Sequence, residues 1–289
     1  MKKRVAQILV CVLFLLAIFP TSAHADMGPK PSIQVDFTGM GDEVYYVTLL
    51  SKEYSTGPAT AYNGNPEYAR YHEDSADYAI WENFVNYSDS DGYYFLQQFE
   101  KCQGNDHYSW DYFPPSPFKI LIYFPESDTF SVSGIYEKYA FDSYFTAAVD
   151  ASDSSMLTVE KDYPFHWELI SLVVRIILTI LVELLIALLF GFRAKKQLQI
   201  IIYTNVLTQT VLNILLNVVA YRSGSLAFTF YYILGECIVC IIEAVIYARL
   251  LPKHSTHAKP IHPILYALLA NVLSFSAGMW IARIIPGIF

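Results

Sequence analysis

The stretch WELISLVVRIILTILVELLIALLF, Trp167–Phe190, decides the fold, because it is a long and almost wholly apolar segment. A helix needs about 20 such residues to cross the hydrocarbon core of a bilayer. Three further apolar runs follow, at residues 198–220, 226–250 and 264–285. The sequence therefore predicts an α-helical transmembrane bundle of four spans over residues 166–289.

The charged residues between these runs predict how the bundle is oriented. The connections at 191–197 and 251–263 carry several lysines and arginines, whereas the connection between the second and third runs holds only Arg222. Loops rich in Lys and Arg face the cytoplasm. Residues 191–197 and 251–263 are therefore expected to be cytoplasmic, and the C-terminus is expected outside the cell.

The N-terminal residues 1–25 resemble a secretory signal peptide. Three positive charges precede the apolar run VAQILVCVLFLLAIF, which ends at Pro20, and Ala23 and Ala25 provide the small-residue pattern that a signal peptidase accepts. The alternative is an uncleaved first span, but this run of 15 residues is shorter than the bilayer core requires. We expect cleavage after Ala25 and export of residues 26–165.

Residues 26–165 form an acidic segment, with 23 acidic against 7 basic residues. This charge repels phosphate backbones, so we expect no nucleic-acid partner. Cys102 is the only cysteine in the segment and cannot form an internal disulfide. A segment of this size can be stabilised by its own core.

Alternating apolar residues predict an exocytoplasmic β-rich domain at 26–165, either β-sandwich-like or α+β. We expect a hairpin of 32–37 with 43–50, an antiparallel meander of 118–125, 129–137 and 139–149, helices at 78–87 and 93–102, and a polar link at 151–162.

No catalytic or metal-binding motif is recognisable. The segment Asp89–Gly92 resembles part of a calcium loop, but the spacing places Gln98 where a bidentate glutamate is needed, so we interpret it as a turn. There is no H-E-x-x-H, G-x-S-x-G or P-loop motif. We expect no metal and no cofactor.

Polar residues within the apolar runs are the candidate functional residues. Charges at membrane depth are costly and usually face a bundle interior or a watery cavity. Their spacing places them on shared helix faces. The candidates are Arg175, Glu183, Asn205, Gln209, Asn213, Glu236 and Glu243.

Their depths predict two polar layers. The inner layer would contain Glu183, Asn205 and Glu243, and the outer layer would pair Arg175 with Glu236. The alternative is that the amides only hydrogen-bond helix to helix and that the charged pairs serve assembly. Buried carboxylates are nevertheless functional-site hypotheses by default.

Five segments carry a resemblance: ADMGPKPSI, YYVTLLS, FGFRAKKQ, TNVLTQTVLN and GECIVCIIEAVIY. In these the chain resembles uncharacterised signal-peptide-bearing multi-pass membrane proteins of Gram-positive bacteria. The resemblance implies a bacterial plasma membrane and carries no known activity or site residues.

Three functions remain open. The first is a membrane-anchored envelope protein whose outer domain binds or senses something, with the lipid bilayer and an envelope or membrane protein as partners. The second is an ion- or proton-coupled transporter or channel component that uses the intramembrane carboxylates, and four spans would require a homo-oligomer for this. The third, an intramembrane enzyme, ranks last because no paired catalytic motif supports it.

Overall fold

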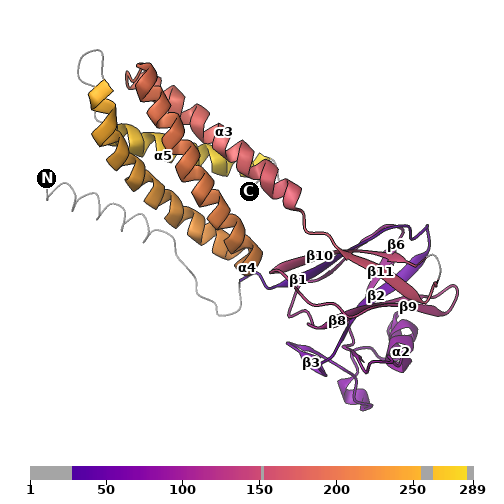
Figure 1. Ribbon diagram of the computed structural model, residues 1–289. Coiled ribbons are helices and arrows are strands. Elements are labelled where there is room, and N and C mark those ends of the chain that lie inside the picture. Colours follow the sequence, from indigo (N-terminus) through magenta and orange to yellow (C-terminus); the bar gives the residue numbers. More distant parts are fainter. Residues whose placement is uncertain (1–27, 151–152, 255–262, 285–289) are drawn as a thin grey trace.

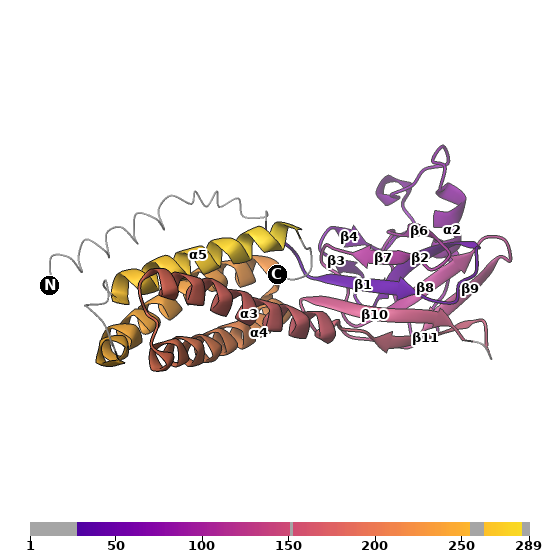
Figure 2. The same cartoon turned by 90° about the horizontal axis from the view of Figure 1, so that it is seen from above.

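The computed structural model describes residues 28–150, 153–254 and 263–284. A β-rich domain precedes a set of long helices, and the two parts lie end to end (Figures 1 and 2). The signal peptide expected at 1–25, with Ala23 and Ala25, lies outside the described residues, as does most of the connection expected at 251–263.

Nine strands form one mixed sheet in the β-rich domain. Its order is β5-β2-β8-β9-β11-β10-β1-β7, and β6 also pairs with β2. The strands are β1 (Ser32–Phe37), β2 (Val44–Ser51), β5 (Tyr94–Phe95), β6 (Glu100–Gln103), β7 (His107–Trp110), β8 (Phe118–Phe124), β9 (Thr129–Ser133), β10 (Asp142–Val149) and β11 (Met156–Lys161). A separate small hairpin consists of β3 (Ser55–Thr56) and β4 (Ala59–Thr60).

The sheet curls into a half-barrel because its two ends are tied together. Strand β6 pairs with β2 near one end of the order, and β7 pairs with β1 at the other end. Only the short turn 104–106 separates β6 from β7, so the chain itself joins the two ends. Alternate residues such as Ile33, Val35 and Phe37 of β1 point into the enclosed core.

A second apolar cluster covers the outer face of β2 and β8. Helix α2 (Tyr78–Asn86) packs Trp81 and Phe84 there against Leu50 and Leu121. Strand β8 is consequently buried on both faces, which explains its continuous apolar run FKILIYF.

The β-rich prediction is confirmed, but several pairings expected from the sequence are wrong. A sandwich of two facing sheets is not formed, because one continuous sheet curls on itself. Strands β1 and β2 do not pair with each other; β1 pairs with β10 in parallel and with β7. Strand β9 does pair with β8, but its other neighbour is β11 rather than β10.

Two secondary-structure assignments are also wrong. The expected helix at 93–102 is replaced by strands β5 and β6, which bond to β2. The expected polar link at 151–162 contains strand β11, whose Leu157 and Val159 are buried. The helix expected at 78–87 is confirmed as α2.

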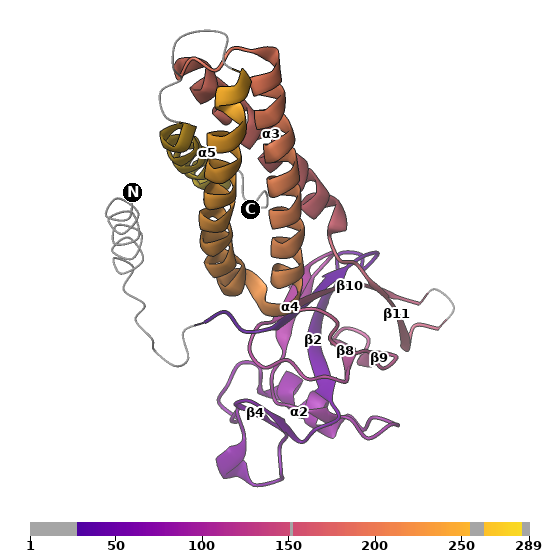
Figure 3. The ribbon, with the colours of Figure 1, turned by 60° about the vertical axis from the view of Figure 1, so that its left-hand side comes forward.

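The helical part contains α3 (Phe165–Leu189), α4 (Lys195–Leu250), η2 (Leu251–His254) and α5 (Pro263–Ile284). Helix α4 breaks at Gly224, which has φ 77° and ψ −174°. It doubles back there, so that two arms lie side by side (Figure 3). The runs expected as separate spans at 198–220 and 226–250 are these two arms.

Within the described residues, two helices are long and apolar enough to cross a membrane, not the four that the sequence predicts. They are α3 and the stretch Lys195–His254, while the apolar stretch Pro263–Gly278 is shorter. The difference arises partly because the turn at 221–225 remains helical on both sides of Gly224, so two expected spans form one helix.

The helices carry polar residues inward and apolar residues outward. Arg175, Thr179 and Glu183 are buried on α3, whereas Leu181 and Leu185 are 55% and 64% exposed. A water-soluble bundle shows the opposite pattern. Polar side chains facing the interior of an apolar bundle are typical of helices in lipid.

We expect residues 26–163 to fold when expressed alone, because both apolar clusters of the β-rich domain lie entirely within them. Reducing agent should leave the melting temperature unchanged. Burial, with Asp106 nearby, raises the pKa of the Cys102 thiol to about 12, which suppresses the reactive thiolate. A broad melt by tyrosine and tryptophan fluorescence would contradict independent folding.

Candidate functional site

Two glutamates are fully buried where α3, α4 and α5 meet. Glu183 comes from α3 and Glu243 from the second arm of α4, and neither is exposed. The two carboxyl groups lie close enough to interact electrostatically. The structure thus brings together two residues that are 60 positions apart in the sequence.

Neutral donors surround the Glu183 carboxyl. Asn205 Nδ2 donates to Glu183 Oε2 at 2.6 Å. The hydroxyls of Tyr247 and Tyr266 lie 3.4 and 3.3 Å from the same oxygen. Both tyrosines are fully buried, and their rings pack against each other.

The Glu243 carboxyl has its own neutral donors. Thr208 Oγ1 lies 2.7 Å from Glu243 Oε1, and Asn271 Nδ2 lies 2.8 Å from Glu243 Oε2. These residues, with those around Glu183, form the carboxylate cluster: Glu183, Asn205, Thr208, Glu243, Tyr247, Tyr266 and Asn271. Among the described residues no group of three or more His, Cys, Asp or Glu could hold a metal.

The inner layer expected from the sequence, Glu183, Asn205 and Glu243, is therefore brought together. The sequence analysis missed Tyr247, Tyr266 and Thr208. A tyrosine in an apolar helix is usually an interface residue, so its sequence position alone does not indicate a buried hydrogen bond.

The other candidates lie nearer the β-rich domain. Arg175 Nη1 donates to Asn213 Oδ1 at 3.0 Å, and its guanidinium lies 5.2 Å from the Phe228 ring. Asn213 Nδ2 in turn donates to the Gln209 carbonyl at 2.8 Å. Arg175, Gln209 and Glu236 line one small cavity of about 10 Å³.

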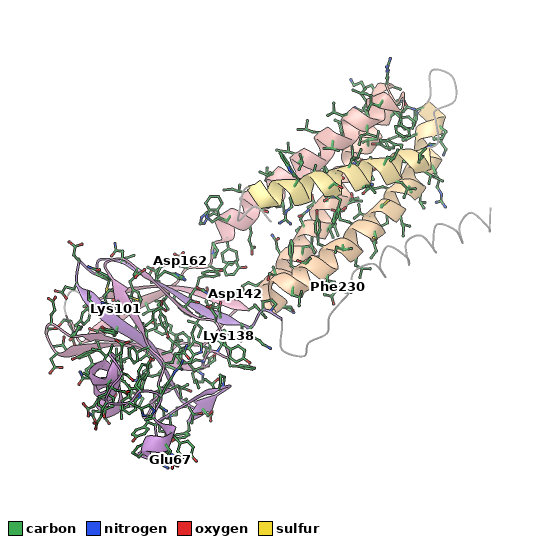
Figure 4. The ribbon with its side chains drawn as sticks, turned by 180° about the vertical axis from the view of Figure 1, so that it is seen from behind. Glu67, Lys101, Lys138, Asp142, Asp162 and Phe230 are labelled. Atoms are coloured by element: carbon green, nitrogen blue, oxygen red, sulfur yellow. The ribbon has the colours of Figure 1, made fainter. Side chains whose placement is uncertain are left out.

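The β-rich domain is docked on the helices where α4 breaks. Phe141 donates its backbone N–H to the Tyr221 carbonyl at 2.8 Å, and its ring lies against Gly224. A cavity of about 660 Å³ opens at this junction, from Asp142 at the domain to Arg175 within the helices. Asp142 and Asp162 mark the junction in Figure 4.

A groove of about 700 Å³ lies on the β-rich domain, lined by the β3–β4 hairpin and the segment after it. Tyr54 and Tyr68 on its rim are 42% and 63% exposed, and Arg70 is exposed beside them. The short helix η1 (Pro66–Tyr68) forms the rim at the end of the domain away from the helices, where Figure 4 labels Glu67.

Gln97 forms the floor of this groove. Its side chain donates to the carbonyls of Thr60 and Tyr68, and it accepts from the Arg70 backbone N–H. Its φ of 57° lies in the left-handed region, which costs energy in a residue other than glycine. The sequence analysis did not identify Gln97, because no local pattern distinguishes it.

The side chain of Lys119, from strand β8, reaches the turn that resembles a calcium loop. Its ammonium lies 2.8 Å from Asp89 Oδ1 and 2.5 Å from Asp91 Oδ2. The Lys119 and Asp89 side chains are 5% and 1% exposed. A lysine thus binds the carboxylates that a cation would need, in agreement with the interpretation of Asp89–Gly92 as a turn.

No protein-family model matches the chain, and no curated protein matches it. It is similar to a solved structure described as a "putative cell adhesion protein from Bacteroides ovatus ATCC 8483". The identity is 12% and the TM-score 0.22, over 47% of this chain and 44% of that one. The chain therefore spans less than half of that protein, and a likeness this slight carries no argument about function.

Proposed function

We propose that the protein is a membrane-anchored cell-envelope protein whose β-rich domain binds an extracellular ligand through the groove at its far end. The groove carries this proposal. Its volume is within the 300–1,000 Å³ typical of ligand sites, and it combines exposed aromatic rings with a cation and the buried amide of Gln97.

The anchor in this proposal is the helical part, with four spans formed by α3, the two arms of α4, and α5. The inward polar and outward apolar residues support it. The Lys- and Arg-rich connection 191–197 lies at the end of the helices away from the acidic domain (Figure 1). That placement supports a cytoplasmic position for this connection and an outer position for the domain and C-terminus.

A photo-reactive phenylalanine in place of Tyr68 tests the groove in intact cells. We expect it to form one discrete adduct, because a ligand in the groove would lie against this side chain. Substitution of Arg70→Ala should reduce the adduct several-fold. Adducts are detected by a mobility shift and identified by mass spectrometry.

The matched control is Ile135, which is 54% exposed on the same domain but does not line the groove. The same reagent at position 135 should give no discrete adduct. Equal adducts at both positions, or none at position 68, would contradict ligand binding in the groove.

The carboxylate cluster favours a second function, ion or proton coupling across the membrane. Two neighbouring carboxyl groups that are fully buried lower the stability of the bundle, and a bundle that only anchors a domain does not need them. Transport would require a second copy of the chain, because four helices enclose little space. No observation in the described residues favours the third hypothesis, an intramembrane enzyme.

A further inference from the structure

Three oxygen atoms in the carboxylate cluster are buried and receive no hydrogen bond from the described residues. They are Glu183 Oε1, Asn205 Oδ1 and Asn271 Oδ1. All three belong to side chains that are at most 4% exposed. A buried polar atom without a hydrogen-bond partner is destabilising, so three in one cluster indicate that something binds there.

The orientation of both amides is fixed by their surroundings. Asn205 Nδ2 donates to the Ile201 carbonyl at 3.1 Å as well as to Glu183. Asn271 Nδ2 likewise donates to the Ala267 carbonyl at 3.0 Å as well as to Glu243. Flipping either amide would set its oxygen against two acceptors. The oxygens of Asn205 and Asn271 therefore remain without a donor.

The charges in the cluster point to the same kind of occupant. Two ionised carboxylates cannot donate to each other, and a shared site for like charges is unfavourable. The donors that reach them are amides and hydroxyls, which are neutral. A positive charge between the carboxyl groups would relieve the repulsion and would use the free oxygens.

We propose that Glu183, Asn205, Glu243 and Asn271 form a binding site for one monovalent metal cation, with Na⁺ as the probe ion. Calcium takes six to eight oxygen ligands, and magnesium requires an octahedral set. Three free oxygens are fewer than either ion requires. This inference rests on the ion-coupled function and not on the groove, so its failure would leave the ligand-binding proposal untouched.

The test uses the full chain purified in detergent in a choline chloride buffer. Its melting temperature is followed by intrinsic fluorescence while NaCl replaces choline chloride at constant ionic strength and pH. An ion that binds only the folded protein stabilises it by mass action. We expect a saturable rise of roughly 5 °C, with KCl as a parallel titration for selectivity.

Glu183→Gln is the decisive variant. The substitution removes one charge and keeps the shape of the side chain. Without Na⁺ the variant should therefore be at least as stable as the unmodified protein, and its melting temperature should no longer rise when Na⁺ is added. Glu236→Gln is the matched control, because Glu236 lies on the same arm of α4 as Glu243 but lines the separate small cavity. This control should keep the response.

Binding of radioactive ²²Na⁺ to the unmodified protein gives a second readout that needs no folded variant. Competition by unlabelled Na⁺ would support the site. A melting temperature that stays unchanged while Na⁺ replaces choline would overturn the proposal. A melting temperature that moves with pH but not with Na⁺, without ²²Na⁺ binding, would overturn it too, because the cluster would then hold a proton alone.

Discussion

Gly224→Ala is expected to destabilise the protein by about 3 kcal/mol and to detach the β-rich domain from the helices. The backbone at Gly224, with φ 77° and ψ −174°, lies in a region that only glycine adopts readily, at a cost of about 1–3 kcal/mol for other residues. A Cβ there would also overlap the Phe141 ring, and overpacking adds about 1–3 kcal/mol. Thermal unfolding in detergent measures the loss of stability.

Gly191→Ala provides the matched control. Gly191 has φ +85°, but a Cβ there would meet nothing within 4 Å. This variant should lose only the stability that the left-handed backbone conformation costs, about 1–2 kcal/mol. Adding Phe141→Ala to Gly224→Ala should restore the stability lost to the overlap of the new Cβ with the ring. It should not restore the stability lost to the backbone conformation at position 224.

Hydrogen exchange identifies whether the domain has detached. The Phe141 amide donates to the Tyr221 carbonyl, so its protection should fall in Gly224→Ala and remain in Gly191→Ala. Equal stability and equal protection in the two variants would show that Gly224 is not a docking point.

Lys119→Met is expected to cost about 3–5 kcal/mol, because it leaves the Asp89 carboxylate buried without its counter-charge. The matched control is Lys52→Met. Lys119 lies 5.3 Å from the Tyr93 ring, and Lys52 lies 5.2 Å from the same ring. Lys52 also donates to the Asp91 carbonyl, but it is exposed. It should change stability by less than about 1 kcal/mol.

Adding Asp89→Asn to Lys119→Met should recover part of the loss, because the amide needs no counter-charge and its oxygen still accepts the backbone N–H groups of Asp91 and Tyr93. Denaturant unfolding of the β-rich domain measures each step. A Lys119→Met variant as stable as Lys52→Met would contradict a buried ion pair.

The same ion pair predicts a pH dependence at both ends of the scale. Burial by itself lowers the pKa of Lys119, but its hydrogen bonds to Asp89 and Asp91 outweigh burial and raise that pKa above 10.5. The hydrogen bond from Lys119 lowers the pKa of Asp91 below 3.8. The raised pKa gives stability that is lost as pH rises through it, and the lowered pKa gives stability that is lost as pH falls through it. In Lys119→Met both losses should disappear.

The pairing of strands could not be predicted from the sequence, although five of the eleven strands in the described residues could. The patterns at 32–37 and 43–50 identify β1 and β2 correctly, because alternating burial is a local property. Their partners are not local. The pairing of β1 with β10 joins residues 32–37 to 142–147, across more than a hundred residues, and no spacing in the sequence encodes that register.

The helix expected at 93–102 is wrong for the same reason, because a partner distant in the sequence decides the structure of this segment. The sequence YYFLQQFEKC carries apolar residues at both helical and strand spacing, so periodicity alone does not decide. The neighbouring β2 decides, because its edge N–H and C=O groups bond to Tyr94–Phe95 and to Glu100–Gln103.

The sequence by itself determined the division into an acidic β-rich domain and a helical part, the ends of the helices to within a few residues, and the helix faces that carry Glu183, Asn205 and Glu243. Composition and helical spacing are sufficient for these features, because they depend on neighbours along the chain. Only the tertiary structure decided that the sheet closes into a half-barrel, that Gln97 holds the floor of a groove, and that Tyr247, Tyr266 and Asn271 complete the carboxylate cluster. Each of these contacts joins segments distant in the sequence, and their free energy depends on burial and on hydrogen-bond geometry that form only when the chain has folded.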